Sequence, residues 1–311
     1  MRRSTGKKAP RAELRGGVFR KAGRTRMLTS EAPRGANAMP VGRYVRRAWP
    51  MIPAHAFRDA FKRRDVKING SRANESDPVS AGDQIELFLP DRYLPEAPEI
   101  SFDDGKLIAC VKPQGLPVDV DSDGIGADTL LSRIRRIHPD AQLCHRLDAQ
   151  TGGLVLAAAD GETLARAEET FKLHAIQKTY LALAKGGFRH AEGTLSGYLV
   201  KNARDSRVTV INHNAPGAKR IETRYRVIED CGAFARVQLE PVTGRTHQLR
   251  AHMASIGHPL IGDDKYGDRD LNRKFGLPLR LWCESVRILK ESPLAEYRGQ
   301  TFASPKPDWW K

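Results

Sequence analysis

The sequence has few cysteines and no long apolar run, and these two shortages exclude several protein classes. Its four cysteines, Cys110, Cys144, Cys231 and Cys283, are scattered and form no C-x-x-C pair. A disulfide framework or a zinc ribbon is therefore not expected, and a reducing compartment fits this cysteine usage best. The longest apolar run, residues 154–159, is far shorter than the roughly 20 residues that a membrane helix needs. We therefore expect a cytoplasmic protein that does not span a membrane.

Metal-binding and dinucleotide-binding patterns are also missing. The nine histidines include no H-E-x-x-H motif. His247 and His252 flank Gln-Leu-Arg-Ala, which lacks the acid that a zinc hydrolase helix carries between its histidines. A metallohydrolase built on this pair would also have too few ligands. We therefore expect no metal and no cofactor.

Positive charge is abundant, and it is concentrated at the front of the chain. The net charge is +15, and residues 1–72 hold 20 lysines and arginines against 4 acids, a local net charge of +16. Residues 73–311 hold 32 basic and 33 acidic residues and are nearly neutral. A charge run usually marks a solvated face, but such a one-sided concentration is typical of a polyanion-binding arm and module.

The front of the chain divides into a tail and a small folded module. Residues 1–38 have little periodicity and predict a disordered basic tail, either an RNA-gripping arm, which we favour, or an organelle transit peptide. Residues 39–92 predict two short basic helices, a hairpin turn at Asn69-Gly70 and a strand at residues 84–89. The cations expected to grip RNA are Arg43, Arg46, Arg47, Arg58, Lys62, Arg63 and Arg64.

Helices of this kind followed by a hairpin resemble the S4 RNA-binding domain, and residues 65–70 carry most of the likeness. A proline-rich stretch then predicts a linker at residues 93–100. We expect a larger domain at residues 101–296 and a C-terminal segment at residues 297–311. Within the larger domain, residues 130–137 have helical spacing that turns Arg133 outward.

In the larger domain, Asp148 precedes a Gly152-Gly153 turn and a short apolar strand. Such a strand must be buried, so Asp148 lies at the edge of a buried region. A carboxylate there must be paired, hydrogen-bonded or protonated, because an unpaired buried charge is costly. Taken alone, an acid in this position is more often a turn residue or a helix cap.

Two later segments carry further polar candidates. Alternation along residues 177–183 places Lys178 and Tyr180 on one strand face, although most strand tyrosines only pack and most strand lysines face solvent. A second strand breaks at Thr243-Gly244, after which Thr246 is expected to cap a helix that buries Leu249, Met253 and Ile256. Arg245 lies at this junction, where side chains commonly line a cleft, while its ordinary alternative is an outward surface arginine.

These clusters, in this order, resemble the RluA family of pseudouridine synthases. The likeness covers most of the chain after residue 100, and with the S4-like front and residues 266–280 it is greatest for the RluC branch, which modifies large-subunit ribosomal RNA. The family usually has Ser or Thr where Gly152 stands, a departure that puts the rigidity of the turn in doubt. The matching stretches are Lys112-Pro113-x-Gly115, His145-Arg146-Leu147-Asp148-x-x-Thr151-x-Gly153, Lys178-x-Tyr180, Gly244-Arg245-Thr246-His247-Gln248-Leu249-Arg250-x-His252, residues 257–263 and Lys265-Tyr266-Gly267.

The resemblance implies an α+β fold with a mixed, largely antiparallel central sheet and a cleft. It assigns the reacting carboxylate to Asp148 and gives Arg245 the task of holding that acid ionised. Tyr180 would stack on the target uracil with its hydroxyl available for proton transfer. Arg146 would fill the space left by a flipped-out uridine. His145, Lys178 and Leu249 would complete the substrate pocket.

The implied reaction detaches uracil from ribose at N1 and reattaches it through C5, so it needs no redox cofactor, metal or second substrate. Two other functions remain open. The same chemistry could act on transfer RNA, because fold does not separate substrates. A non-catalytic RNA-binding ribosome-assembly factor would be favoured if Asp148 or Arg245 were missing, and both are present. We expect RNA as the partner and a monomeric protein.

Overall fold

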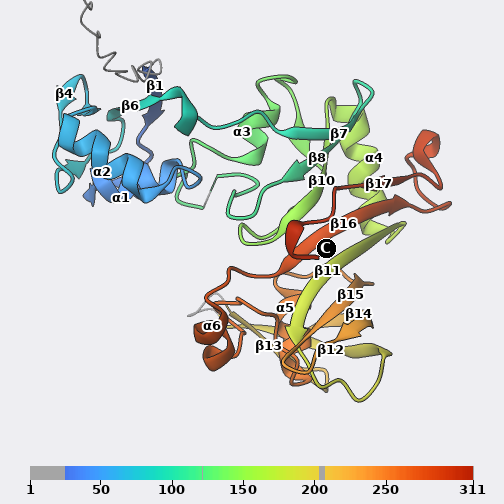
Figure 1. The fold of residues 1–311 in the computed structure, drawn as a ribbon. Coiled ribbons are helices and arrows are strands. Elements are labelled where there is room, and N and C mark those ends of the chain that lie inside the picture. Colours follow the sequence, from blue (N-terminus) through green and yellow to red (C-terminus); the bar gives the residue numbers. More distant parts are fainter. Residues whose placement is uncertain (1–24, 121, 203–206, 311) are drawn as a thin grey trace, which may run out of the picture.

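The structure, a computed structural model, describes residues 25–120, 122–202 and 207–310. It contains a small N-terminal unit and a larger unit built on an 11-stranded sheet, each with its own hydrophobic core (Figure 1). In the described residues, no helix has both the length and the apolar character needed to cross a bilayer.

The N-terminal unit packs two basic helices against a four-stranded sheet of order β1-β6-β3-β4. Residues at helical spacing in α1, such as Val41 and Val45, are fully buried, as is Phe57 in α2. Pro50 ends α1, because the residue before a proline avoids the helical conformation. The elements are β1 (Thr25–Glu31), η1 (Arg34–Ala36), β2 (Met39–Pro40), α1 (Val41–Ala48), α2 (Ala54–Arg63), β3 (Val66–Ile68), β4 (Ser71–Arg72), β5 (Pro78–Val79), β6 (Gln84–Pro90) and η2 (Asp91–Tyr93).

The large sheet has the strand order β13-β12-β14-β15-β11-β16-β10-β8-β7, with β9 and β17 beside β10 and β16. Its pairs are antiparallel except for β10 with β16, which confirms the expected mixed, largely antiparallel sheet. The elements are β7 (Glu99–Asp103), β8 (Leu107–Lys112), α3 (Leu130–Ile134), β9 (Gln142–Leu143), β10 (Gly152–Ala158), α4 (Gly161–Lys172), β11 (Ile176–Lys185), β12 (Glu192–Asn202), β13 (Arg207–Ile211), β14 (Lys219–Asp230), β15 (Phe234–Pro241), α5 (Gln248–Ser255), α6 (Arg269–Phe275), β16 (Leu281–Ile288), η3 (Ala295–Tyr297), β17 (Thr301–Ala303) and η4 (Asp308–Trp310).

Three expected boundaries are wrong. Residues 25–38 are not tail, because β1 pairs with β6 along its whole length and Ala36 is fully buried; residues 1–24 lie outside the described part. The linker is shorter than residues 93–100, because β7 begins at Glu99 and pairs with β8. The C-terminal segment belongs to the large unit, because β17 pairs with β16 and places Phe302 in the core.

The expected orientation of Arg133 is also wrong. Its guanidinium is buried and donates Nε to Asp128 Oδ1 at 2.7 Å and Nη2 to Asp128 Oδ2 at 2.8 Å. Helical spacing alone could not show this, because the partner carboxylate lies outside α3. A bidentate pair of this kind satisfies both buried charges.

The loop between β8 and α3 joins the two units. Ile125, 2% exposed, packs in the N-terminal core, and the Asp128 N–H donates to the Ala48 carbonyl at 2.8 Å. Arg47 pairs with Asp123 at 2.8 Å. An earlier part of the same loop, Pro117, Val118 and Asp119, lines the cavity described below. The N-terminal unit is therefore attached to the rim of that cavity, and not only through the chain at residues 93–98.

The parallel pair explains why glycine stands at position 152. Gly152 lies opposite Trp282, and a Cβ at Gly152 would come within 2.4 Å of the indole ring. The ring is held in place, because its Nε1 donates to Ser304 Oγ at 2.8 Å. The family usually has Ser or Thr at this position. Here the ring of Trp282 on the neighbouring strand occupies the space that such a side chain would need.

We expect Gly152→Ser to destabilise the protein by about 1–3 kcal/mol, the usual cost of overpacking a filled core. In a Trp282→Leu background the same substitution should cost much less, because the clashing ring is absent. Urea unfolding of the four proteins gives the coupling energy. Equal costs of Gly152→Ser in both backgrounds would refute the pairing of Gly152 with Trp282.

Candidate active site

A single large cavity gathers the sequence-predicted residues. It has a volume of about 1130 Å³, and its walls come from the loops after β8 and before β10, the start of β11 and the turn between β15 and α5. The predicted residues on its lining are His145, Arg146, Asp148, Lys178, Tyr180, Arg245 and Leu249. Segments as far apart in the chain as Pro117 and Leu281 are therefore brought to one place.

The loop that carries Asp148 is anchored by a buried lysine. Lys112 is 0% exposed, and its Nζ donates to the carbonyls of Leu116 at 2.7 Å, Ala149 at 2.9 Å and Pro113 at 3.1 Å. Burial lowers the pKa of Lys112 to about 7, and the negative charge of Asp148 opposes this shift. One ammonium group thus joins the turn after β8 to the residue that follows Asp148.

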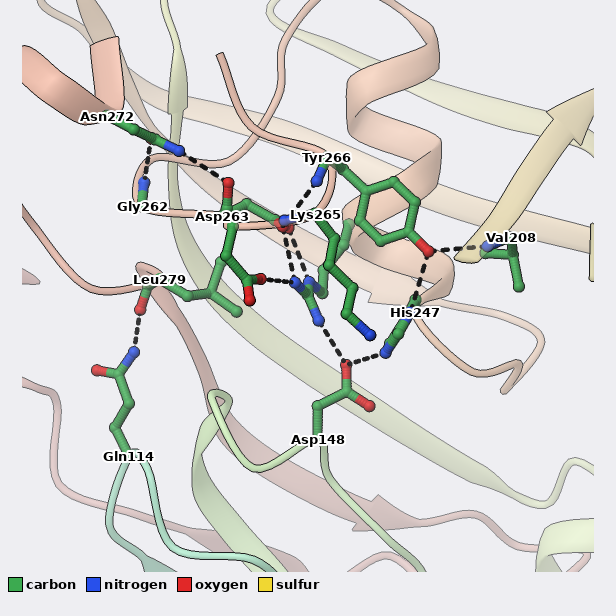
Figure 2. A network of polar contacts seen from close by, with 12 residues as sticks. Gln114, Asp148, Val208, His247, Gly262, Asp263, Lys265, Tyr266, Asn272 and Leu279 are labelled. Carbon is green, nitrogen blue, oxygen red and sulfur yellow. Dashed lines mark hydrogen bonds and ion pairs between the residues drawn. The ribbon is translucent and has the colours of Figure 1, made fainter. Parts of the chain in front are cut away.

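The Asp148 carboxylate contacts Arg250 and His247. Its Oδ2 lies 3.4 Å from Arg250 Nη1, and the side chain is 28% exposed. The same oxygen lies 3.7 Å from His247 Nε2, and Figure 2 shows this histidine directed at Asp148. Arg250 itself is only 3% exposed, and its Nε and Nη2 donate to Asp263 at 2.7 Å each. Asp263 therefore fixes the plane of the guanidinium and leaves Nη1 directed at Asp148.

Arg250 remains charged although it is buried. Burial by itself lowers the pKa of Arg250, but hydrogen bonds to Asp263 and the charges of Asp263, Asp148 and Asp264 outweigh it, so the pKa is raised. The ring of Tyr266 covers the guanidinium at 5.4 Å. Asp148 therefore has a permanently positive neighbour.

The expectation that Arg245 pairs with Asp148 is wrong in this structure. Arg245 is exposed on the cavity wall, and its guanidinium forms no ion pair with the described residues. The paired arginine is five residues later, because the turn continues further than expected. The helix α5 begins at Gln248 with His247 in the N-cap position, not at Thr246, and Ile256 is 37% exposed instead of buried.

Gln248 sets the direction of α5. Its Nε2 donates to the Glu222 carbonyl at 2.9 Å, and its Oε1 accepts from the Thr243 hydroxyl at 2.8 Å and from the Arg245 N–H at 3.1 Å. These bonds fasten the turn to β14 and hold Arg250 on the side of the helix that faces the cavity. Our sequence reasoning did not select Gln248 or Arg250, although both lie in the matched stretch.

Tyr180 and Lys178 both face the cavity from β11, as alternation predicted. Tyr180 is 6% exposed, and burial raises its pKa well above the ordinary value, with Cys283 and Asp148 adding to the rise. Its hydroxyl is therefore protonated at neutral pH. Burial lowers the pKa of Lys178, whose Nζ lies 5.8 Å from the centre of the Phe171 ring.

His145 supports the loop from behind. Its Nε2 accepts from the Leu156 N–H at 3.0 Å, and its ring lies against Phe171. Burial lowers the pKa of His145 to about 3, and the positive charge of Lys178 adds to the shift. Arg146 is exposed at the cavity, while Leu249 is 6% exposed on its wall.

The second histidine of the matched stretch has a different environment. His252 is 2% exposed, its Nδ1 lies 3.0 Å from Thr223 Oγ1, and burial lowers its pKa to about 4. His247 contacts Asp148 and Tyr266 instead. The two histidines thus have separate partners.

The predicted RNA-binding cations fall into two groups. Arg46, Arg47 and Arg63 form ion pairs with Glu75, Asp123 and Asp65. The remaining four are exposed and form no ion pair with any residue that the structure describes. These four are Arg43, Arg58, Lys62 and Arg64.

Comparisons with known proteins identify the family of this chain. Residues 106–255 match the family model described as RNA pseudouridylate synthase. The ribosomal large subunit pseudouridine synthase C of Haemophilus influenzae is 35% identical over 263 residues, 78% of this chain and 80% of that protein. The chain belongs to the RluA family of pseudouridine synthases.

A second bacterial relative and a solved human structure are also similar to this chain. The ribosomal large subunit pseudouridine synthase C of Escherichia coli is 29% identical over 252 residues, 75% of this chain and 78% of that protein. The solved structure of human RNA pseudouridylate synthase domain containing 1 aligns with a TM-score of 0.57 at 25% identity, covering 69% of this chain and 86% of that one. The expected fold and the likeness to the RluC branch are confirmed.

The neutral buried histidines predict a pH-dependent stability. The unfolded chain protonates His145 and His252 near pH 6.5, whereas the folded chain does so only near pH 3 and pH 4. The unfolded state therefore binds more protons in this window, and the free energy of unfolding falls as pH drops. We expect a loss of about 2 kcal/mol per histidine between pH 7 and pH 5.

Urea unfolding at both pH values measures this loss. The variant His252→Gln keeps a polar group near Thr223 but cannot titrate, so its stability should fall less over the same interval. An equal fall in the wild type and the variant would contradict the assignment of His252.

Proposed function

We propose that this pseudouridine synthase isomerises uridines in large-subunit ribosomal RNA and that Asp148 is its reacting carboxylate. The observation that carries the proposal is the Asp148 side chain, held in the cavity by the buried cation of Arg250. Family membership supports the reaction, and the names of the bacterial relatives support ribosomal RNA as the substrate.

The charge arrangement suits a carboxylate that must react while ionised. The positive charge of Arg250 is already compensated by Asp263 and Asp264. Its contact with Asp148 can therefore weaken or strengthen as the charge on that carboxylate changes during the reaction. Whether Asp148 adds covalently to the sugar or base or removes a ribose proton, it must begin as an anion. Arg250 places a guanidinium nitrogen 3.4 Å from this carboxylate.

The isomerisation breaks the N1–C1′ bond and forms a C5–C1′ bond. C5 loses a proton and N1 gains one, so the composition is unchanged. Tyr180 is buried with its hydroxyl protonated, and we assign it to stack on the uracil ring and to take part in proton transfer. Leu249 supplies an apolar wall, and Lys178 and His145 support the pocket.

The exposed cations suit an extruded nucleotide. A uridine must leave its stack to reach Asp148, at a cost of a few kcal/mol. Arg146 and Arg245 both project at the cavity without an ion-pair partner in the described residues, so each can contact phosphate or occupy the vacated space. We therefore assign Arg245 to substrate binding and not to holding Asp148.

The N-terminal unit is proposed to be an S4-like RNA-binding module. Its free cations, Arg43, Arg58, Lys62 and Arg64, would contact the phosphate backbone, which supplies affinity without reading sequence. Because this unit is attached to the cavity rim through Ile125 and Asp123, RNA bound to it would be delivered in a fixed position relative to Asp148.

The variant Asp148→Asn should bind RNA with nearly wild-type affinity, because asparagine has almost the same shape. Its pseudouridine formation should fall by roughly three orders of magnitude or more, as loss of a reacting group does. Single-turnover assays on ribosomal RNA, with filter binding as the control, measure both. Turnover near the wild-type rate would refute the assignment of Asp148.

Replacing Arg43, Arg58, Lys62 and Arg64 together by glutamine should weaken RNA binding and flatten its salt dependence. Each lost phosphate contact reduces the slope of log K against log salt by about 0.7–0.9, so the variant should lose about 3. The control replaces Arg46 and Arg63, whose charges are already paired, and should change the slope less. An unchanged slope in the variant with all four substitutions would show that these cations do not contact the RNA phosphates.

A further inference from the structure

A chain of polar contacts leads from an edge strand of the sheet to Asp148. The Val208 N–H in β13 donates to the Tyr266 hydroxyl at 2.9 Å, and that hydroxyl lies 3.0 Å from His247 Nδ1. The other nitrogen of the same ring, Nε2, lies 3.7 Å from Asp148 Oδ2. Figure 2 shows these contacts joined one after another, with His247 between the Tyr266 hydroxyl and Asp148.

The donors and acceptors along these contacts determine which nitrogen of His247 carries the proton. A backbone N–H can only donate, so the Tyr266 oxygen accepts from Val208, and its own proton is available to His247 Nδ1. A neutral imidazole with an acceptor Nδ1 carries its proton on Nε2, which faces Asp148. The opposite tautomer would direct a lone pair at the carboxylate and leave the tyrosine proton without this acceptor.

The neutral state of His247 also follows from its surroundings. The charged groups that face it are Asp148, Arg250, Asp263 and Lys265. Burial lowers the pKa of His247, Asp148 opposes the shift, and Arg250 and Lys265 add to it. A second positive charge beside Arg250 is therefore disfavoured, and His247 faces the carboxylate as a neutral ring whose Nε2 lies 3.7 Å from Asp148 Oδ2, longer than a direct hydrogen bond.

The backbone at His247 shows that its position is constrained. Its φ is 55°, in the left-handed region that residues other than glycine rarely adopt. Such a conformation persists only where the surroundings hold it, and it is frequent where a side chain must be aimed at a site. Here both ring nitrogens have partners, so the strain is balanced by a fixed ring orientation.

We propose that Tyr266 and His247 are positioning residues for Asp148. Tyr266 sets the tautomer of His247 so that Nε2–H faces the carboxylate, and the two residues tie the position of Asp148 to strand β13. Arg250 then supplies charge from one side, and His247 holds its Nε2–H toward the carboxylate from another, at 3.7 Å from Oδ2. This inference rests on the proposed function, in which Asp148 is the reacting group.

Two substitutions at His247 separate this role from a merely structural one. Gln places an amide N–H where Nε2–H stands but fits the left-handed backbone poorly, whereas Asn fits that backbone but cannot reach Asp148. We expect His247→Gln to keep kcat within about tenfold of the wild type and His247→Asn to lose more, with KM for ribosomal RNA unchanged in both. Activity of His247→Asn equal to or above that of His247→Gln would overturn the proposal.

The variant Tyr266→Phe keeps the ring over Arg250 and removes only the hydroxyl. Its kcat should fall about fivefold to tenfold, the effect of one hydrogen bond, with KM unchanged. In a His247→Asn background the same change should have little further effect, because the contact with Asp148 is already lost. Additive effects of the two substitutions would show that Tyr266 acts independently of His247 and would overturn the proposal that Tyr266 positions Asp148 through His247.

Nitrogen NMR of histidine-labelled protein tests the tautomer without any assay of activity. At pH 7 the wild type should show His247 with a proton on Nε2 and an acceptor Nδ1, assigned by loss of these signals in His247→Asn. A proton on Nδ1, or on both nitrogens, would overturn the proposed role of Tyr266 and His247. A wild type with the expected tautomer but no pseudouridine formation would instead refute the proposed function. The contacts of His247 with Tyr266 and Asp148 would still be supported.

Discussion

The guanidinium of Arg250 is shared between Asp148 and Asp263, and the organisation of the site depends on this shared charge. Asp263 takes two of its nitrogens at 2.7 Å, which fixes the plane of the group and leaves Nη1 for Asp148 at 3.4 Å. A buried cation without such partners would be strongly destabilising. Because Asp263 carries most of the compensation, Asp148 can stay partly exposed to the cavity, where a substrate can reach it.

Three distant segments must meet for this arrangement to exist. Lys112 holds the loop of Asp148 through the Ala149 carbonyl, Gln248 fastens the start of α5 to β14, and Tyr266 covers Arg250 from the loop before α6. Each anchor uses backbone carbonyls or buried charges, which tolerate little displacement. The result is a cavity whose polar groups are oriented before any RNA is bound.

The attachment of the N-terminal unit has a consequence for how the two units act together. The loop after β8 lines the cavity at Pro117 and, a few residues later, buries Ile125 in the N-terminal core. Removing the N-terminal unit would expose Ile125 and release the rim. Point substitutions of surface cations therefore test RNA binding more cleanly than deletion of the whole unit.

The amino-acid sequence was enough to predict the fold class, the two basic helices, the β3–β4 hairpin and the cavity residues Asp148, Tyr180 and Lys178. The helices and the hairpin follow from local periodicity and turn chemistry, which act over a few residues. The fold class and the roles of the cavity residues follow from the resemblance of spaced motifs to a known family. Only the tertiary structure decided that Arg250, and not Arg245, pairs with Asp148, that Arg133 is buried against Asp128, and that residues 25–38 belong to the N-terminal sheet. Each of these depends on a partner from another segment: the start of α5 is set by Gln248 and β14, and the strand β1 exists because β6 pairs with it. Local patterns carry no information about such partners, so pairing could be read only from the folded chain.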